Sequence, residues 1–520
     1  MNDHLSLRLE KAAGPILLFG AALRILVFFM PGHTNSGDSL TRVVLTDAWL
    51  HNHSSLGNAF GPWLPLHFWM IGGLGLLLKN TMLAGRLLSL ISSLASLVLV
   101  WRIAQKLYGP AAGSLSLLVF SLYSLHIGYS IIPASETPYL LFLLLGLYGF
   151  FAYQQSGRLP FLALSGLSMT LACAIRYEAW AILFMMTILT FICQPENFNN
   201  RDSRYGRRLF PLLVFGFCGS LWPIPWLIYS WKEWGHPLYF VSMNHRWVAE
   251  QVALSHSSKI YQIGLTPGVI LLTLSPLALL GSLYALFLAT KENKGRALAV
   301  IFAFSGVVQL YQIVSGGVMP YARYTMTLGT LLSLMSGWGL LRFTQKHSPG
   351  FSRWLLPCLA GTLVLNLATL LVLSETRNPL SDKFVEISPR LRERHYISDT
   401  AEYLRSHLSI NDSIVIDDYN TDSILVAESA GLPNKSGQHI LLATESTASR
   451  VLDFIENNRS TYVVYAANGS LKRYLQLPGS CPNKCVIAGR EFQCVYETKI
   501  YQIYRVTPSE SEMLPASDTR

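Results

Sequence analysis

The sequence predicts a polytopic α-helical membrane protein of about eleven transmembrane helices, followed by a small α/β domain at its carboxyl end. Of its 520 residues, 51% are hydrophobic and only 13% are charged, whereas soluble domains carry about 25% charged residues. Apolar runs near or above ~18 residues recur, and each is long enough to cross a hydrocarbon core of roughly 30 Å. The pattern changes at about residue 375, where short strand-like runs replace the long apolar ones.

The apolar runs lie near residues 12–30, 83–101, 111–130, 138–152, 160–175, 179–193, 209–230, 266–289, 297–315, 324–341 and 354–374. The fourth to sixth runs are short, which leaves room for tilted, broken or re-entrant segments. The first run follows Arg8 and Lys11, and no small-residue cleavage pattern precedes Pro31. We therefore expect a retained signal anchor rather than a cleaved signal peptide.

The basic residues predict the orientation. If the amino terminus is cytosolic, the cytosolic loops carry Arg102, Lys106, Arg158, Arg201, Arg204, Arg207, Arg208, Lys291, Lys294, Arg296, Arg342, Lys346 and Arg353. The opposite loops, although longer, carry Arg42, Lys79, Arg176, Lys232, Arg246, Lys259 and Arg323. The positive-inside rule then places the carboxyl-terminal domain outside the cytosol. This bias accounts for the net charge of +10 without a nucleic-acid partner.

The long outward loop at residues 31–81 contains the stretch Gly37-Asp38-Ser39. A carboxylate just past a first span lies where a lipid-carried substrate meets a water-borne one, so Asp38 is the leading candidate for a catalytic base. The plainer interpretation is that Asp38 caps a helix beginning near Ser39. Asp47 is a rival base, but it lies in a segment with helical periodicity and fits a solvated helix face.

Further charges fall on the same predicted side. Glu136 precedes Thr137-Pro138 at the start of the fourth span, Arg176 and Glu178 flank Tyr177 between two apolar runs, and Arg323 precedes Tyr324 at the start of the tenth span. Charges at such depth are rare and face a protein interior or a wet cavity. Arg176 with Glu178 also fits a purely structural ion pair. Arg24 and Arg86, inside or beside apolar runs, either reach the headgroups or pair inside the bundle.

Residues 376–508 are predicted to form the small α/β domain. Residues 398–408 have helical spacing, and residues 413–418, 461–465, 494–497 and 500–504 resemble strands. Residues 509–520 have the composition of a disordered tail. Two of Cys481, Cys485 and Cys494 fit a disulfide on the non-cytosolic side, in a pairing that the sequence leaves open, and a zinc site is less favoured.

Taken together, Gly37-Asp38-Ser39, Ser135-Glu136-Thr137-Pro138, Arg176-Tyr177-Glu178 and Arg323-Tyr324 resemble the GT-C superfamily of membrane glycosyltransferases. The nearest likeness is to the protein-mannosyltransferase-like branch, which includes the aminoarabinose transferase of lipid A. The resemblance covers the membrane part, residues 1–375, and the outward α/β domain. Many relatives carry a second acid where this chain has Ser39, so a two-carboxylate metal site is not expected there.

The resemblance implies an inverting glycosyltransferase that moves a sugar from a polyprenyl phosphate, either dolichyl or undecaprenyl, to an acceptor on the non-cytosolic face. Asp38 would be the catalytic base. Arg323 and Tyr324 would bind the donor phosphate. Glu136, Arg176 and Glu178 would bind substrate. The acceptor, whether protein, lipid or glycan, stays open, as does the membrane: the inner membrane in a bacterium or the endoplasmic reticulum in a eukaryote.

Two other functions and a cofactor stay open. A transporter or flippase of lipid-linked sugars also needs many spans, but such proteins tend to show repeated halves and charges near mid-membrane. A non-catalytic membrane scaffold has no need of converging charges. The need for a cofactor also stays open: a divalent cation would be held by some of His33, His51, His53 and His67 together with Asp38 or Glu136, but these residues lack the tight ligand spacing typical of a metal site.

Overall fold

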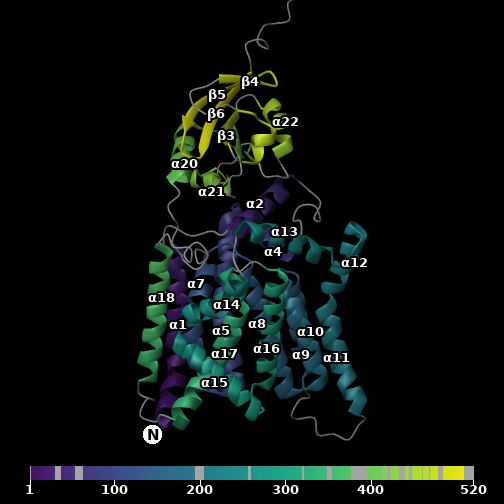
Figure 1. Cartoon of the computed structure of the whole chain (residues 1–520), viewed down its shortest axis with the longest axis vertical. Coiled ribbons are helices and arrows are strands. Elements are labelled where there is room, and N and C mark those ends of the chain that lie inside the picture. Colours follow the sequence, from purple (N-terminus) through teal and green to yellow (C-terminus); the bar gives the residue numbers. More distant parts are fainter. Residues whose placement is uncertain are drawn as a thin grey trace, which may run out of the picture. The chain divides into compact units, whose positions relative to one another are not determined.

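The computed structural model describes most of the chain (Figure 1). The described residues are 2–29, 37–52, 63–193, 204–255, 259–318, 321–347, 354–375, 395–409, 412–417, 423–432, 440–443, 448–458, 461–467, 469–477 and 484–508. The predicted tail at 509–520, Cys481, His33 and His53 lie outside them.

The chain divides into two compact units by its internal contacts. The first comprises residues 1–34, 60–67 and 86–390, and the second comprises residues 35–59, 68–85 and 391–520. Part of the predicted loop at 31–81 therefore groups with the carboxyl-terminal domain.

The described residues of the first unit form helices joined by turns and include no strand (Figure 1). Its helices are α1 (Asn2–Phe29), most of α5 (Thr81–Tyr108), α6 (Pro110–Ser121), α7 (Ser124–Tyr129), α8 (Glu136–Ser156), α9 (Leu159–Cys173), α10 (Glu178–Ile192), α11 (Arg204–Ser220), α12 (Pro223–Trp234), α13 (Tyr239–Ser255), α14 (Lys259–Leu274), α15 (Pro276–Lys291), α16 (Arg296–Ser315), the short 3-10 helix η1 (Ala322–Thr325), α17 (Met326–His347) and α18 (Leu355–Glu375). Every predicted apolar run falls on one or two of these helices.

Several helices are long and apolar enough to cross a membrane. By length and composition, four described helices qualify on their own, namely α1, α5, α8 and α16, and two bent pairs raise the number to six if each pair is one span. Five shorter apolar helices add to these. The predicted count of eleven spans thus stays a prediction.

The run predicted at 266–289 is not one straight span. Its two halves, on α14 and α15, meet at 112°. Ser275 adopts a positive φ of 74° at the break, and its hydroxyl accepts a hydrogen bond from the Ala278 amide. Pro276 follows, and proline is well suited to the first turn of a helix because its missing N–H is not needed there. The hydropathy of the run continues across this break, which is why the sequence pattern did not reveal it.

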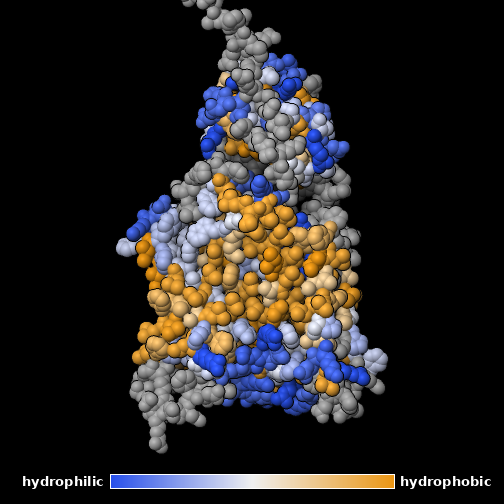
Figure 2. All heavy atoms as spheres, turned by 180° about the vertical axis from the view of Figure 1, so that it is seen from behind, coloured by the Kyte–Doolittle hydropathy of each residue, from blue (hydrophilic) through white to orange (hydrophobic). Residues whose placement is uncertain are grey.

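Small residues bring helices of this unit close together. A Cβ added to Gly337 of α17 would lie 2.2 Å from the Ala112 carbonyl oxygen of α6, and one on Gly339 would meet the backbone of Gly281 on α15. Tight backbone approach through small residues is typical of helix packing in membranes. Facing outward, large apolar side chains stay exposed, among them Leu213, Phe217, Leu280, Val307 and Leu365. Figure 2 shows hydrophobic residues as a broad band on one face, with hydrophilic residues at its lower end.

The second unit contains the predicted α/β domain. Its sheet has the order β2-β1-β3-β6-β5-β4, from β1 (Ser413–Asp417), β2 (Ile440–Ala443), β3 (Thr461–Ala466), β4 (Lys484–Ile487), β5 (Arg490–Glu497) and β6 (Tyr501–Pro508). Strand β1 pairs in parallel with β2 and β3, and the remaining pairs are antiparallel. Helices α20 (His395–His407), α21 (Ser423–Ser429) and α22 (Val451–Glu456) accompany the sheet.

Two hydrophobic cores occupy this domain. One includes Ile414, Ile416 and Val464 together with α20 and α21, and the other includes Val415, Val463 and Phe492 together with α22. Alternate residues of β1 and β3 enter different cores, as the two faces of a strand require. Cys494 is disulfide-bonded, in agreement with the predicted disulfide. Cys485 is a free thiol, so the pairings that include Cys485 are excluded.

Candidate active site

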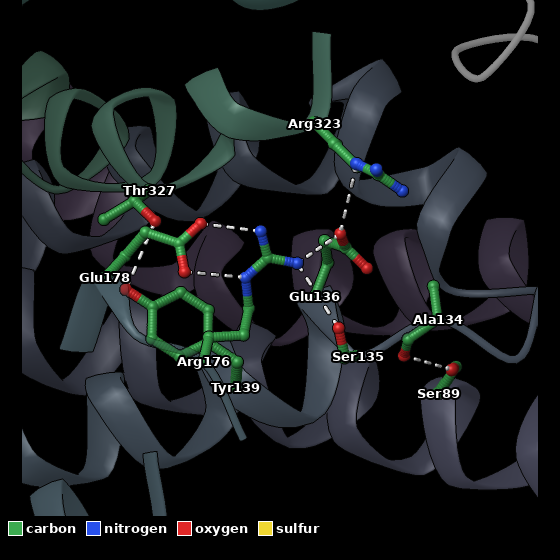
Figure 3. A network of polar contacts seen from close by, with 9 residues as sticks. All are labelled: Ser89, Ala134, Ser135, Glu136, Tyr139, Arg176, Glu178, Arg323 and Thr327. Carbon is green, nitrogen blue, oxygen red and sulfur yellow. Dashed lines mark hydrogen bonds and ion pairs between the residues drawn. The ribbon is translucent and has the colours of Figure 1, made fainter. Parts of the chain in front are cut away.

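Four of the predicted charged residues lie together in the first unit (Figure 3). Glu136 is the first residue of α8, Arg176 lies in the turn between α9 and α10, Glu178 is the first residue of α10, and Arg323 lies in η1 just before α17. An acidic residue in the first turn complements the partial positive charge of a helix amino terminus. The local sequence thus places all four charges at helix ends rather than along a helix.

Arg176 is the centre of the cluster. Its Nε and Nη2 donate to the two carboxylate oxygens of Glu178 at 3.1 and 2.6 Å. Its Nη1 contacts Glu136 Oε1 and donates to the Ser135 hydroxyl at 3.3 Å. The predicted pairing of Arg176 with Glu178 is therefore present, and a second carboxylate joins it.

Glu136 links the two arginines. Its Oε1 atom contacts Arg176 and lies 4.0 Å from Arg323 Nε. The side chains of Glu136 and Arg323 are only 5% and 4% exposed, and that of Glu178 is 29% exposed. The two arginines and two glutamates balance in charge, as buried charges require.

The Glu136 and Glu178 carboxylates also affect the pKa of Arg176. Burial alone would lower the pKa of the Arg176 guanidinium, but the Glu178 and Glu136 carboxylates outweigh this effect and hold that pKa well above its ordinary value. Arg176 therefore stays charged at any physiological pH.

Aromatic rings border both guanidinium groups. The Tyr324 ring lies 5.5 Å from the Arg176 guanidinium carbon and 5.2 Å from that of Arg323. The Tyr321 ring lies 5.0 Å from that of Arg323. These distances fit cation–π contacts, so Tyr324 contacts both arginines of the cluster. Nearby, the Thr327 hydroxyl lies 3.3 Å from the Tyr139 hydroxyl (Figure 3).

Two residues of α5 hold the turn that precedes Glu136. Arg86 Nε donates to the Ile131 carbonyl at 3.0 Å, and its Nη2 donates to the Phe28 carbonyl at 2.7 Å. Ser89, one helical turn further on, donates to the Ala134 carbonyl at 3.3 Å (Figure 3). The sequence singled out Arg86 as a charge that either reaches the headgroups or pairs inside the bundle. Ser89 and Tyr139 carried no signal, because a serine or tyrosine in an apolar helix is common.

Arg24 pairs inside the bundle. It is fully buried, and it donates to the Ser93 hydroxyl and to the carbonyls of Gly20, Phe120 and Ser121 at 2.8 to 3.0 Å. The Phe120 and Ser121 carbonyls are at the end of α6, so Arg24 donates hydrogen bonds to backbone groups at the break between α6 and α7. The sequence left open whether Arg24 and Arg86 reach the headgroups or pair inside the bundle. Both donate to backbone carbonyls, so both pair inside the bundle.

The candidate base lies in the second unit. Asp38 is half-buried in the first turn of α2 (Gly37–Asn52). The helix begins two residues earlier than predicted, so Asp38 lies inside its first turn rather than before it. Its role as the catalytic base stays a prediction. Asp47, the rival, accepts a hydrogen bond from the Thr81 hydroxyl at 3.2 Å, which indicates a structural role.

A metal site is not assigned. Within the described ranges, no three histidine, cysteine or acidic side chains form a group that could hold a metal ion. Of the four histidines singled out, His67 is buried.

The fold of this chain, a helical unit with a carboxyl-terminal α/β domain, is similar to that of solved structures of ArnT. ArnT from Cupriavidus metallidurans in the apo state matches with a TM-score of 0.59 at 13% identity, covering 95% of this chain and 98% of that one. The same protein bound to undecaprenyl phosphate matches with a TM-score of 0.57 at 14% identity and the same coverage. The apo oligosaccharyltransferase of Archaeoglobus fulgidus matches with a TM-score of 0.49 at 12% identity, covering 89% of this chain and 69% of that one.

A family comparison agrees with the fold. Residues 61–215 match the dolichyl-phosphate-mannose-protein mannosyltransferase family. This segment contains Glu136, Arg176 and Glu178 but neither Asp38 nor Arg323. No curated protein sequence matches the chain significantly. The predicted resemblance to GT-C glycosyltransferases is confirmed, and the chain is a multi-pass membrane protein.

Proposed function

We propose that the protein is an inverting glycosyltransferase that moves a sugar from a polyprenyl phosphate to an acceptor hydroxyl at the non-cytosolic membrane face. The observation that carries the proposal is the charge cluster of Glu136, Arg176, Glu178 and Arg323 at adjacent helix ends of an apolar helical unit. A polyisoprenoid carrier must stay in the bilayer while its phosphate reaches water, so its site belongs at such helix ends.

Arg323 is suited to the donor phosphate. A guanidinium offers paired donors to phosphate oxygens and neutralises the charge that develops on the leaving group. Tyr324 borders the same guanidinium and would contact the phosphate beside it. Undecaprenyl phosphate bound to the structurally similar ArnT supports this class of donor.

Asp38 would act as the base. As the acceptor oxygen attacks the anomeric carbon, its proton passes to the Asp38 carboxylate, and the bond between that carbon and the phosphate oxygen breaks. Polyprenyl phosphate leaves as the anion, and attack from the opposite side inverts the anomeric centre. General-base help of this kind contributes roughly 10²- to 10⁴-fold in rate.

Arg176, Glu136 and Glu178 would form the wall of the substrate site. Glu178, at 29% exposure the least buried member, is the carboxylate best placed to accept sugar hydroxyls. Loop charge supports the non-cytosolic side for this end of the unit.

The proposal is tested with purified full-length protein and radiolabelled undecaprenyl- and dolichyl-phosphate sugars, with membrane-extracted lipids and peptides as acceptors. Asp38→Asn should lower transfer by at least roughly 100-fold with donor binding retained. Asp47→Asn is the matched control on the same helix. It should stay active, because the asparagine carbonyl can still accept the Thr81 hydrogen bond.

If the Asp38→Asn variant transferred sugar at the wild-type rate, Asp38 would not be the catalytic base. Lipid-linked sugar that crosses a vesicle membrane intact, with no transfer, would instead favour the transporter.

A further inference from the structure

One face of the helix that carries Asp38 is built into the carboxyl-terminal domain. Leu40 and Val43 of α2 are 1% and 0% exposed, and they belong to the same hydrophobic core as α20, α21 and one face of the sheet. Leu40 and Val43 are three residues apart and therefore share a face of the helix. Helix α2 also contacts α21 directly.

Helix α2 and the carboxyl-terminal domain are buried together in this one core, rather than touching at their surfaces. Val426 and Ala427 of α21, with Leu404 of α20, are at most 2% exposed in the same cluster. Met82 at the start of α5 joins it. Separating α2 from the domain would open fully buried apolar surface to water, which is unfavourable.

Other contacts within the same unit fix the rest of α2. The Arg42 guanidinium lies 5.2 Å from the Phe68 ring of α4 (Leu66–Leu78). Trp49 packs so closely against Gly72 of α4 that a Cβ there would lie 3.0 Å from the indole. Asp47 holds the carboxyl-terminal half of α2 to Thr81 at the start of α5. The helix is therefore clamped between the domain and α4.

We propose that the carboxyl-terminal α/β domain is a positioning module for α2, with Leu40 and Val43 as the positioning residues that set where the Asp38 carboxylate lies. Asp38 is only two residues before Leu40 on the same rigid helix. The inference rests on the proposed function, because it gives the domain a role in the transfer reaction. A misplacement of about 1 Å at a reacting group can cost roughly 100-fold in rate.

The test compares three variants of the full-length protein in the transfer assay. Leu40→Ala removes the contact from the α2 side, and Val426→Ala removes it from the α21 side. Leu475→Ala is the matched control, because Leu475 is equally buried in the other core of the same domain. We expect the first two to lower kcat at least roughly tenfold with the donor Kd unchanged, and Leu475→Ala to keep the wild-type kcat. Leu40→Met, which preserves volume, should restore kcat.

Two further measurements separate positioning from plain destabilisation. In the Asp38→Asn background, Leu40→Ala should change the residual rate less than twofold, since there is no longer a base to position. Hydrogen exchange of the α2 amides should rise in Val426→Ala but not in Leu475→Ala, and this reading needs no activity.

The outcomes distinguish the two proposals. A wild-type protein that transfers sugar, with Leu40→Ala and Val426→Ala as active as wild type, would overturn the positioning role and leave the transferase intact. Equal losses in all three variants would also overturn it. A wild-type protein that transfers no sugar would overturn both.

Discussion

Replacing Glu136 with glutamine removes one negative charge from between two arginines and preserves the size of the side chain. Glu136 Oε1 contacts Arg176 and lies 4.0 Å from Arg323 Nε, and both Glu136 and Arg323 are about 95% buried. In the variant, Arg176 keeps its two hydrogen bonds to Glu178. The two arginines then face a single carboxylate.

The expected loss follows from the distances. Two unit charges at 4.0 Å interact with about 4 kcal/mol at an effective dielectric constant of 20. Breaking a buried ion pair by removing one partner costs about 3 to 5 kcal/mol. We therefore expect Glu136→Gln to lower the free energy of unfolding by about 3 to 5 kcal/mol.

The matched control is Glu292→Gln. Glu292 pairs with Arg342 at 3.0 Å, but these side chains are 38% and 46% exposed. Exposed pairs contribute less than about 1 kcal/mol because water and salt screen them. The two variants therefore remove the same chemical group from environments that differ in burial.

The free energy of unfolding is measured by titration of the purified protein with sodium dodecyl sulfate in mixed micelles. A loss below about 1 kcal/mol for Glu136→Gln, equal to that of Glu292→Gln, would refute the view that a buried charge network holds these helix ends together.

Arg86→Lys should lower kcat/KM about tenfold in the transfer assay, because an ammonium cannot bind the carbonyls of Ile131 and Phe28 as a fork does; an unchanged value would mean that the turn before Glu136 needs no support from α5. Gly337→Ala should destabilise the protein by about 1 to 3 kcal/mol through overpacking against Ala112. Gly306→Ala on α16, where no atom of another described segment lies within 4 Å of the added methyl group, should not; equal stabilities would argue against tight packing of α6 on α17. Asp417→Asn should destabilise the carboxyl-terminal domain by about 1 to 3 kcal/mol, measured by local hydrogen exchange, because its buried carboxylate accepts from the amides of Ala466 and Leu471.

Much of the helical unit follows from hydropathy. Every predicted apolar run falls on helices, because a long apolar run satisfies its backbone in lipid only as a helix. The break at Ser275 escaped the prediction, because the residues on both sides are equally apolar. The short strands β2 and β4 were also missed, since four residues give too little alternation to detect.

The candidate site was predicted in part. Charges beside apolar runs identified Glu136, Arg176, Glu178 and Arg323, because a charge at such depth requires a partner. The hydrogen bonds and ion pairs among these four residues could not be predicted from the sequence, since spacing along the chain cannot tell which carboxylate Arg176 binds. The inclusion of Leu40 and Val43 in a core assembled from residues beyond 390 had no sequence signal. Contacts between segments so distant in sequence depend on tertiary packing.

In the proposed reaction, a sugar leaves a polyprenyl phosphate at this site. The most direct measurement is the ratio of free polyprenyl phosphate to glycosylated acceptor produced by the purified wild-type protein, with the anomeric configuration of the product determined by nuclear magnetic resonance. We expect one free lipid phosphate per sugar transferred and an inverted anomeric centre. A retained configuration, or lipid-linked sugar that stays intact in the presence of acceptor, would contradict it.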